Sequence, residues 1–183
     1  MQSHPRILVV YAHPLHSHSR VNRRLIDLAR AVEHVQVHDL YETYPDFHID
    51  IEHDQALLAQ ADLIVFQHPL LWYSMPSLLK EWVDVVLEKG WAYGDGGVAL
   101  RRKDFWLVTS AGGDATAYSD GAYHGHPFSA FLPQYRQMAN LCGMRWHEPL
   151  VMFGADDASN ETIDMHAESY RHRLATYPQW LSE

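Results

Sequence analysis

The fold of this chain is indicated first by the run Ile7-Leu-Val-Val-Tyr-Ala-His13-Pro14. Five apolar residues in succession are typical of a strand buried on both faces, and the histidine and proline end it. Ser17, Ser19 and Asn22 follow, and a helical pattern begins at Val21. A strand, a polar loop and a helix start form a βα turn whose free N–H groups suit a phosphate. The loop has neither GxGxxG nor GxxxxGK[ST], so we expect a mononucleotide, with flavin as the leading candidate.

Length and composition limit the class of protein. The 183 residues, 47% apolar and 20% charged, fit one globular domain, 1–183, without repeats or a linker. A net charge of −9 argues against a nucleic-acid partner, which needs a basic surface. The single cysteine, Cys142, fits a reducing compartment, and no apolar run is long enough to span a membrane. We therefore expect a cytoplasmic protein, with any membrane association peripheral at the inner face of the cell membrane.

Apolar runs alternate with helical periodicity along the chain. Continuous apolar runs predict strands, and apolar residues at three- and four-residue spacing predict helices. The predicted strands are 7–11, 35–39, 63–66, 105–109 and 146–153, the last one interrupted by Pro149. The predicted helices are 21–35, 54–61, 75–89, 128–141 and 159–177. This order predicts an α/β fold, a flavodoxin-like, doubly wound, five-stranded parallel sheet with helices on both faces.

In such a sheet a ligand lies beyond the carboxyl ends of the strands, so the segments there are candidates for a site. The loop from His13 to Asn22 follows the first strand, Gln67-His-Pro-Leu-Leu-Trp-Tyr73 ends the third, and Thr109-Ser-Ala-Gly-Gly113 ends the fourth. Each combines small or planar residues with backbone amides, which suit a flat heterocycle. Either of the last two segments alone could be an ordinary turn beside core aromatics. Three such segments at successive strand ends favour a binding site.

These segments also carry a resemblance to a known family. The chain resembles the NAD(P)H:quinone oxidoreductases of the DT-diaphorase type, and among them the ancillary flavoproteins of the bacterial glutathione-gated Kef potassium-efflux systems. The matching segments are Tyr11-Ala-His-Pro14, Ser19-Arg-Val-Asn22, Tyr44-Pro-Asp-Phe47, Ile49-Asp-Ile51, Gln67-His-Pro69, Trp72-Tyr-Ser74, Leu78-Leu-Lys-Glu-Trp82, Gly90-Trp-Ala-Tyr93 and Cys142-Gly143. They span roughly residues 7–150, so the resemblance covers most of the chain.

The resemblance implies non-covalent FMN or FAD, NAD(P)H as co-substrate, a homodimer with the active site at its interface, and ping-pong, two-electron reduction of quinones. The implied cofactor-binding residues are His13, Ser19, Arg20, Val21 and Asn22 around the flavin phosphate, Pro69, Leu70, Leu71 and Trp72 along the ring, and Thr109, Ser110, Ala111 and Gly112 at its other edge. We favour FMN, because a short chain leaves little room to bind adenosine. Ala111 replaces a common glycine of relatives, so it must not need a positive φ.

Tyr118 and His124 are the candidate catalytic residues. The resemblance implies that a tyrosine and a histidine after the fourth strand assist charge and proton transfer, which suits a phenol and an imidazole that titrates near neutrality. Because the loop length differs, Tyr123 competes with Tyr118 for this role. His124 could also be an ordinary loop histidine, one of 14 in the chain. The paired loop histidines lack cysteine or carboxylate neighbours at familiar spacing, so we expect no metal site.

Two other functions stay open. The chain could be an ancillary regulatory subunit that activates a Kef-type potassium–proton antiporter, with redox activity secondary. An electron-carrier flavodoxin is less favoured, because His13-Pro14 stands where a Thr/Ser-rich phosphate loop is usual. The choice between NADH and NADPH and the identity of the quinone are not determined by these residues.

Overall fold

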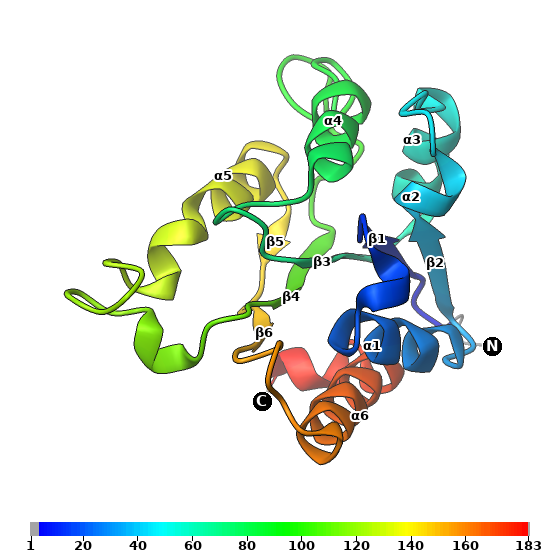
Figure 1. The fold of residues 1–183 in the computed structure, drawn as a ribbon. Helices are drawn as coiled ribbons and strands as arrows, with labels where there is room; N and C mark the ends of the chain where they lie inside the picture. The colour runs from blue at the N-terminus through cyan, green and yellow to red at the C-terminus, as the bar shows by residue number, and fades with distance from the viewer. Residues whose placement is uncertain (1–3, 183) are drawn as a thin grey trace.

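A parallel sheet forms the centre of the computed structural model, which describes residues 4–182 (Figure 1). Residues 1–3 and Glu183, the ends of the predicted domain, lie outside the described residues. The strands are β1 (Ile7–Tyr11), β2 (Val35–Asp39), β3 (Leu63–Pro69), β4 (Asp104–Ser110), β5 (Arg145–Trp146) and β6 (Leu150–Met152). Their order is β2-β1-β3-β4-β5, with β6 also on β4, and every pairing is parallel. The predicted α/β, doubly wound arrangement is therefore confirmed.

The predicted fifth strand is two short strands, which makes the sheet six-stranded instead of five-stranded. Both β5 and β6 pair with β4, and the gap between them contains Pro149. Proline has no N–H to donate to a ladder, so the pairing stops around it. In contrast, β3 and β4 run further than predicted and pair as far as Pro69 and Ser110. This extension holds the two loops of the candidate site in one register.

Helices cover both faces of the sheet (Figure 1). On one face α1 (Val21–Arg30) and α6 (Asn160–Thr176) lie side by side, and α3 (Ile51–Gln60), α4 (Ser77–Val86) and α5 (Pro133–Leu141) cover the other. The short elements are α2 (Leu40–Thr43), which was not predicted, and the 3-10 turns η1 (His16–His18), η2 (Ala115–Ala117), η3 (Phe128–Phe131) and η4 (Gln179–Ser182). Within residues 4–182, none of the helices combines the length and the apolar character needed to cross a membrane.

The helix predicted over 75–89 is shorter at both ends and is observed as Ser77–Val86. Three other predicted helices also differ in their bounds, each for a local reason. The first helix ends at Arg30, because the next N–H groups bond to carbonyls three residues back and turn the chain toward β2. The second predicted helix starts three residues earlier, since the Asp50 carboxylate caps its first turn. The predicted helix 128–141 is divided into η3 and α5, because Pro133 lacks an N–H and fits only the first turn of a helix.

Two apolar layers, one on each face of the sheet, hold the helices in place. Successive residues of a strand point to opposite faces. Phe66 and Phe105 accordingly pack among α3, α4 and α5, whereas Val9 and Trp106 pack among α1 and α6. All four side chains are at most 2% exposed. The central strands are thus fixed from both sides, and so are the loops at their carboxyl ends.

Candidate functional site

A cavity of about 450 Å³ opens at the carboxyl ends of β1, β3 and β4. Ten of the thirteen predicted cofactor-binding residues line it: His13, Ser19, Arg20, Val21, Asn22, Pro69, Leu70, Leu71, Ser110 and Gly112. The remaining wall is formed by Pro14, Leu15, His18, Ala155 and Asp156. The three strand-end segments, far apart in the sequence, therefore converge on one space. That they bind a cofactor stays a prediction.

The other three predicted cofactor-binding residues do not line this cavity. Thr109 and Ala111 lie behind the wall, at 2% and 1% exposure. The Thr109 hydroxyl donates to the His68 carbonyl at 2.8 Å, and the Ala111 N–H donates to the Met152 carbonyl at 2.8 Å. Ala111 is not among the described residues with positive φ, so the alanine fits this loop without strain. Trp72 is 94% exposed and is not part of the cavity lining in the single chain.

Asn22 joins the three segments of the site. Its side-chain Nδ2 donates to Ser110 Oγ at 2.8 Å, its carbonyl accepts from Gln67 Nε2 at 3.1 Å, and its N–H donates to Ser19 Oγ at 3.1 Å. Asn22 Oδ1 and Gln67 Oε1 are both buried and find no hydrogen-bond partner among the described residues. An unpaired buried acceptor costs about 1–3 kcal/mol. Asn22 also lines the cavity, whereas Gln67 lies behind its wall, so the Asn22 oxygen is the one that favours a polar ligand with a hydrogen-bond donor.

His13 faces the cavity as a neutral ring. Its Nδ1 accepts from the Leu15 N–H at 3.1 Å, which leaves the ring proton on Nε2. Burial, together with the nearby His16, lowers the pKa of His13 to about 4. At neutral pH the ring thus offers an N–H donor without a positive charge. Positive charge comes instead from Arg20, which donates to Asn160 Oδ1 at 2.9 Å, and from the N-terminus of α1.

Gly112 lies close to the side chain of Asp156. A Cβ at Gly112 would lie 2.5 Å from Asp156 Oδ2, so any larger residue must displace that carboxylate. Asp156 belongs to the loop after β6 and lines the cavity, although the sequence analysis missed it. Its place at the carboxyl end of the last parallel strand was the signal that could have found it.

Tyr118 and His124 form a stacked pair, with ring centroids 4.1 Å apart and planes inclined by 18°. Tyr118 is 9% exposed, whereas Tyr123 is 90% exposed and meets His124 edge-on, so the geometry favours Tyr118. Burial and the neighbouring Tyr73 raise the pKa of Tyr118, which keeps its phenol protonated at neutral pH. A Cβ at Gly113 would lie 2.8 Å from His124 Nε2, so this nitrogen sits directly over the loop that follows β4.

Tyr73, which was not predicted, is held beside His124 by a strained turn. Its Oη lies 3.3 Å from His124 Nδ1. Leu71 and Ser74 exchange two backbone hydrogen bonds of 3.0 Å, and the two residues between them, Trp72 and Tyr73, have φ of 48° and 64°. A left-handed conformation costs a non-glycine residue roughly 1–2 kcal/mol. Strain of this kind concentrates at functional sites.

Known proteins share both the fold and the length of this chain. A family model described as a flavodoxin-like fold matches residues 5–174. The glutathione-regulated potassium-efflux system ancillary protein KefF of Klebsiella aerogenes is 43% identical over 174 residues, which make up 94% of this chain and 97% of the relative.

Two solved structures superpose closely on the chain. General stress protein 14 of Treponema denticola, solved in complex with FMN, is 32% identical with a TM-score of 0.88, over 93% of this chain and 98% of its own. A protein from P. pentosaceus described as an NADPH-quinone reductase is 27% identical with a TM-score of 0.84, over 94% and 98%. With a family match over residues 5–174 and a KefF relative along nearly its whole length, the chain belongs to the flavodoxin-like fold family, among the relatives of the Kef ancillary proteins.

Proposed function

We propose that this protein is a flavin-dependent NAD(P)H:quinone oxidoreductase that binds FMN at the carboxyl end of its sheet. The main support is the convergence of ten predicted residues on one cavity, among them Asn22 with its buried, unpaired Oδ1. FMN fits such a site, because its ribityl hydroxyls and ring N–H are donors. A cavity of about 450 Å³ also suits FMN better than the larger FAD. The FMN complex and the NADPH-quinone reductase among the similar structures agree with this choice.

Each part of the wall has a separate role in holding the cofactor. The His13 N–H, the Arg20 guanidinium and the N–H groups at the start of α1 would hold the phosphate. Asn22 would accept a hydrogen bond from the polar chain of the cofactor, with Gln67 behind it on the Asn22 carbonyl. The backbone of 69–71 and 110–112 would flank the ring. When bound, the flavin supplies the hydride chemistry that links NAD(P)H to a quinone.

The Tyr118–His124 pair is proposed to supply the proton of the reaction. Two-electron reduction of a quinone to a hydroquinone adds a hydride and a proton, so a proton donor must lie at the site. The His124 imidazole can give a proton to a quinone oxygen, and it is held in place by the Tyr118 ring and by Tyr73 Oη. The phenol of Tyr118 stays protonated and can donate a hydrogen bond to developing negative charge.

Steady-state oxidation of NADH and of NADPH with benzoquinone, under anaerobic conditions, tests this function. We expect turnover that requires FMN and that falls about 100-fold in Tyr118→Phe and in His124→Gln, with FMN content unchanged. Tyr123→Phe is the matched control and should keep wild-type turnover. Absence of quinone turnover in the FMN-loaded protein would contradict the proposal.

The proposal includes a homodimer. Leu71, Trp72 and Tyr73 are 38%, 94% and 43% exposed and form an apolar group at the edge of the cavity. Exposed apolar groups of this kind mark interaction surfaces, and a second copy lying over the site would also exclude water from it. Light scattering should give twice the mass of the chain, and Trp72→Arg should shift the protein toward monomer. A wild-type protein that is monomeric at high concentration would refute the dimer.

The 43% identity to KefF favours a second candidate function, namely activation of a Kef-type potassium–proton antiporter from the cytoplasmic face of the membrane. Both functions can reside in one protein. Potassium efflux from cells that co-express the antiporter would test this role. If His124→Gln abolishes quinone turnover but keeps efflux activation, the two functions are separable.

A further inference from the structure

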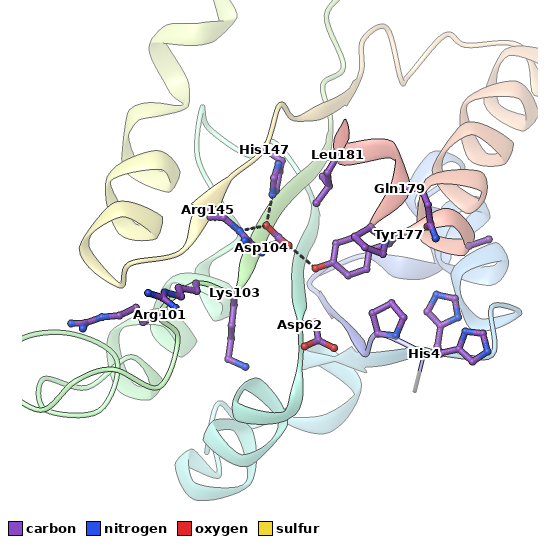
Figure 2. A pocket seen from close by; sticks show the side chains of 15 residues that line it. His4, Asp62, Arg101, Lys103, Asp104, Arg145, His147, Tyr177, Gln179 and Leu181 are labelled. Atoms are coloured by element: carbon purple, nitrogen blue, oxygen red, sulfur yellow. Dashed lines mark hydrogen bonds and ion pairs between the residues drawn. The ribbon is translucent and has the colours of Figure 1, made fainter. Parts of the chain in front are cut away.

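A second cavity, of about 1440 Å³, lies at the amino end of the sheet, opposite the candidate flavin site (Figure 2). It contains residues that immediately precede or begin β3, β4 and β5. The charged ones are Asp62, Arg101, Arg102, Lys103, Asp104 and Arg145. None of these residues lines the flavin cavity. A ligand here would therefore not compete with FMN or quinone.

Asp104 anchors the floor of this cavity. The carboxylate is 1% exposed and accepts from Arg145 Nε and Nη2 at 2.7 Å each, from His147 Nε2 at 2.6 Å and from Tyr177 Oη at 2.6 Å (Figure 2). Burial opposes ionisation, but the hydrogen bonds from His147, Arg145 and Tyr177 outweigh it and lower the pKa of Asp104 to about 2. Asp104 is thus saturated with donors, and it orients Arg145 while Nη1 of that guanidinium stays available.

The rim of the cavity carries positive charge that the described chain does not neutralise. Arg101 and Arg102 are exposed and form no ion pair within residues 4–182. The Arg102 N–H donates to the Gly143 carbonyl at 2.8 Å, and this bond holds Arg102 at φ 69°. The backbone of Arg102 is therefore strained. Four of the chain's 14 Lys and Arg residues line this cavity, together with two acidic residues. The cavity is therefore basic, although the whole chain has a net charge of −9.

The pattern of donors indicates which anion would bind. Compact phosphate sites use backbone N–H groups. Here the N–H groups of 101–104 and 145 already donate to backbone carbonyls of the same region. Only side-chain cations remain, in a cavity larger than the 300–1,000 Å³ of usual small-molecule sites. Guanidinium groups bind carboxylates and phosphates alike in a bidentate way. The size of the cavity and the occupied backbone N–H groups therefore favour an extended acidic surface over a small phosphate ligand.

We propose that the cavity at the amino end of the sheet, with Arg101, Arg102 and Arg145 at its rim, is a docking site for an acidic, Asp/Glu-rich segment of a partner protein. The partner would be repelled by much of this acidic chain, net charge −9, and attracted at this face. Such an arrangement fixes the orientation of docking more than it adds affinity. The docking site is independent of the flavin chemistry, because it lies at the other end of the sheet.

Fluorescence anisotropy with a labelled oligoglutamate peptide, on the full-length FMN-loaded protein at low ionic strength, tests the docking site. The double variant Arg101→Gln/Arg102→Gln removes the two unpaired charges. The matched control, Arg23→Gln/Arg136→Gln, removes two exposed arginines that do not line this cavity. Thermal unfolding and FMN content show that both variants are folded and that the flavin site is intact.

We expect the peptide to bind, to release at high salt, and to lose about tenfold in affinity in Arg101→Gln/Arg102→Gln but less than about twofold in the control. Oligolysine should not bind. Equal losses in both variants would overturn the proposal, since they would show general charge attraction. Tighter, Arg101- and Arg102-dependent binding of tripolyphosphate or of anionic phospholipid vesicles, without peptide binding, would also overturn it. Loss of FMN from the wild-type protein would bear on the proposed oxidoreductase alone.

Discussion

Two clusters of buried polar groups, one around Asp104 at the amino end of the sheet and one around Asn22 at the carboxyl end, differ in how they are paired. At the amino end, the Asp104 carboxylate accepts four hydrogen bonds from Arg145, His147 and Tyr177. At the carboxyl end, Asn22 and Gln67 are 2% and 0% exposed, yet their side-chain oxygens have no partner in the described chain. A saturated group stabilises the fold, whereas an unsaturated one costs free energy that a ligand can recover. The contrast thus separates a structural cluster from the proposed binding site within one sheet.

The largest expected effect is at the amino end. Asp104→Ala leaves Arg145, His147 and Tyr177 without their shared acceptor and should lower the free energy of unfolding by about 3 kcal/mol. Urea denaturation of wild type and variant measures this. Asp62→Ala, an exposed acidic residue of the same cavity, should change stability by no more than about 0.5 kcal/mol. If Asp104→Ala instead reduced FMN affinity at unchanged stability, the structural role given to the Asp104 cluster at the amino end would be wrong.

At the carboxyl end we expect the opposite pattern. Asn22→Leu removes the unpaired oxygen and leaves the Ser110 side chain at the cavity wall without the donor that positions it, so FMN affinity should fall about 100-fold. The FMN-free protein should lose only about 1 kcal/mol of stability, for the buried bond to Ser110, because removal of the unpaired acceptor relieves a cost that the wild type already carries. Titration with FMN and urea denaturation give the two quantities. Asn140→Leu, at an exposed position on α5, is the control and should keep FMN affinity. A large loss of stability with unchanged FMN binding would assign Asn22 to the fold.

A smaller effect is expected at Gly112. The added methyl of Gly112→Ala displaces Asp156 Oδ2 and should weaken FMN binding about tenfold. Asp156→Ala should restore part of the affinity in the double variant, because it removes the atom that the methyl meets. FMN titration of the single and double variants measures the coupling. Additive losses would show that Asp156 is not the obstacle.

The smallest effect is a difference in pH dependence between the two ends. Burial lowers the pKa of His13 from 6.5 in the unfolded chain to about 4 in the native chain. Between these two pH values His13 is protonated in the unfolded chain but stays neutral in the native chain. His13 therefore reduces stability as pH falls from 6.5 toward 4, a loss that His13→Gln should remove. The pKa of Asp104 is about 2, so its contribution persists through this window and declines only below about pH 4. Urea denaturation at neutral and mildly acidic pH compares the variants. Identical pH profiles of wild type and His13→Gln would contradict the buried, neutral ring.

The sequence predicts the carboxyl end of the sheet far better than the amino end. Apolar periodicity locates the strands, and the ends of parallel strands must share an edge, so His13, Asn22, Pro69 and Ser110 could be placed together in advance. Which side chains face the cavity depends on local geometry, so the sequence could not show that Trp72 lies outside the lining of the single-chain cavity. The cluster around Asp104 gave no signal, because its partners come from distant segments and meet only through packing.

The central claim is that the carboxyl end of the sheet binds FMN and uses it between NAD(P)H and quinone. Purified protein should be titrated with FMN, then treated anaerobically with NADPH or NADH, and then with benzoquinone, while the visible flavin absorbance is followed. We predict that one FMN binds per chain, that its absorbance falls with the nicotinamide and returns with the quinone, and that Asn22→Leu shows little bound FMN. A protein that takes up no FMN, or whose bound FMN responds to neither nicotinamide, would contradict the claim.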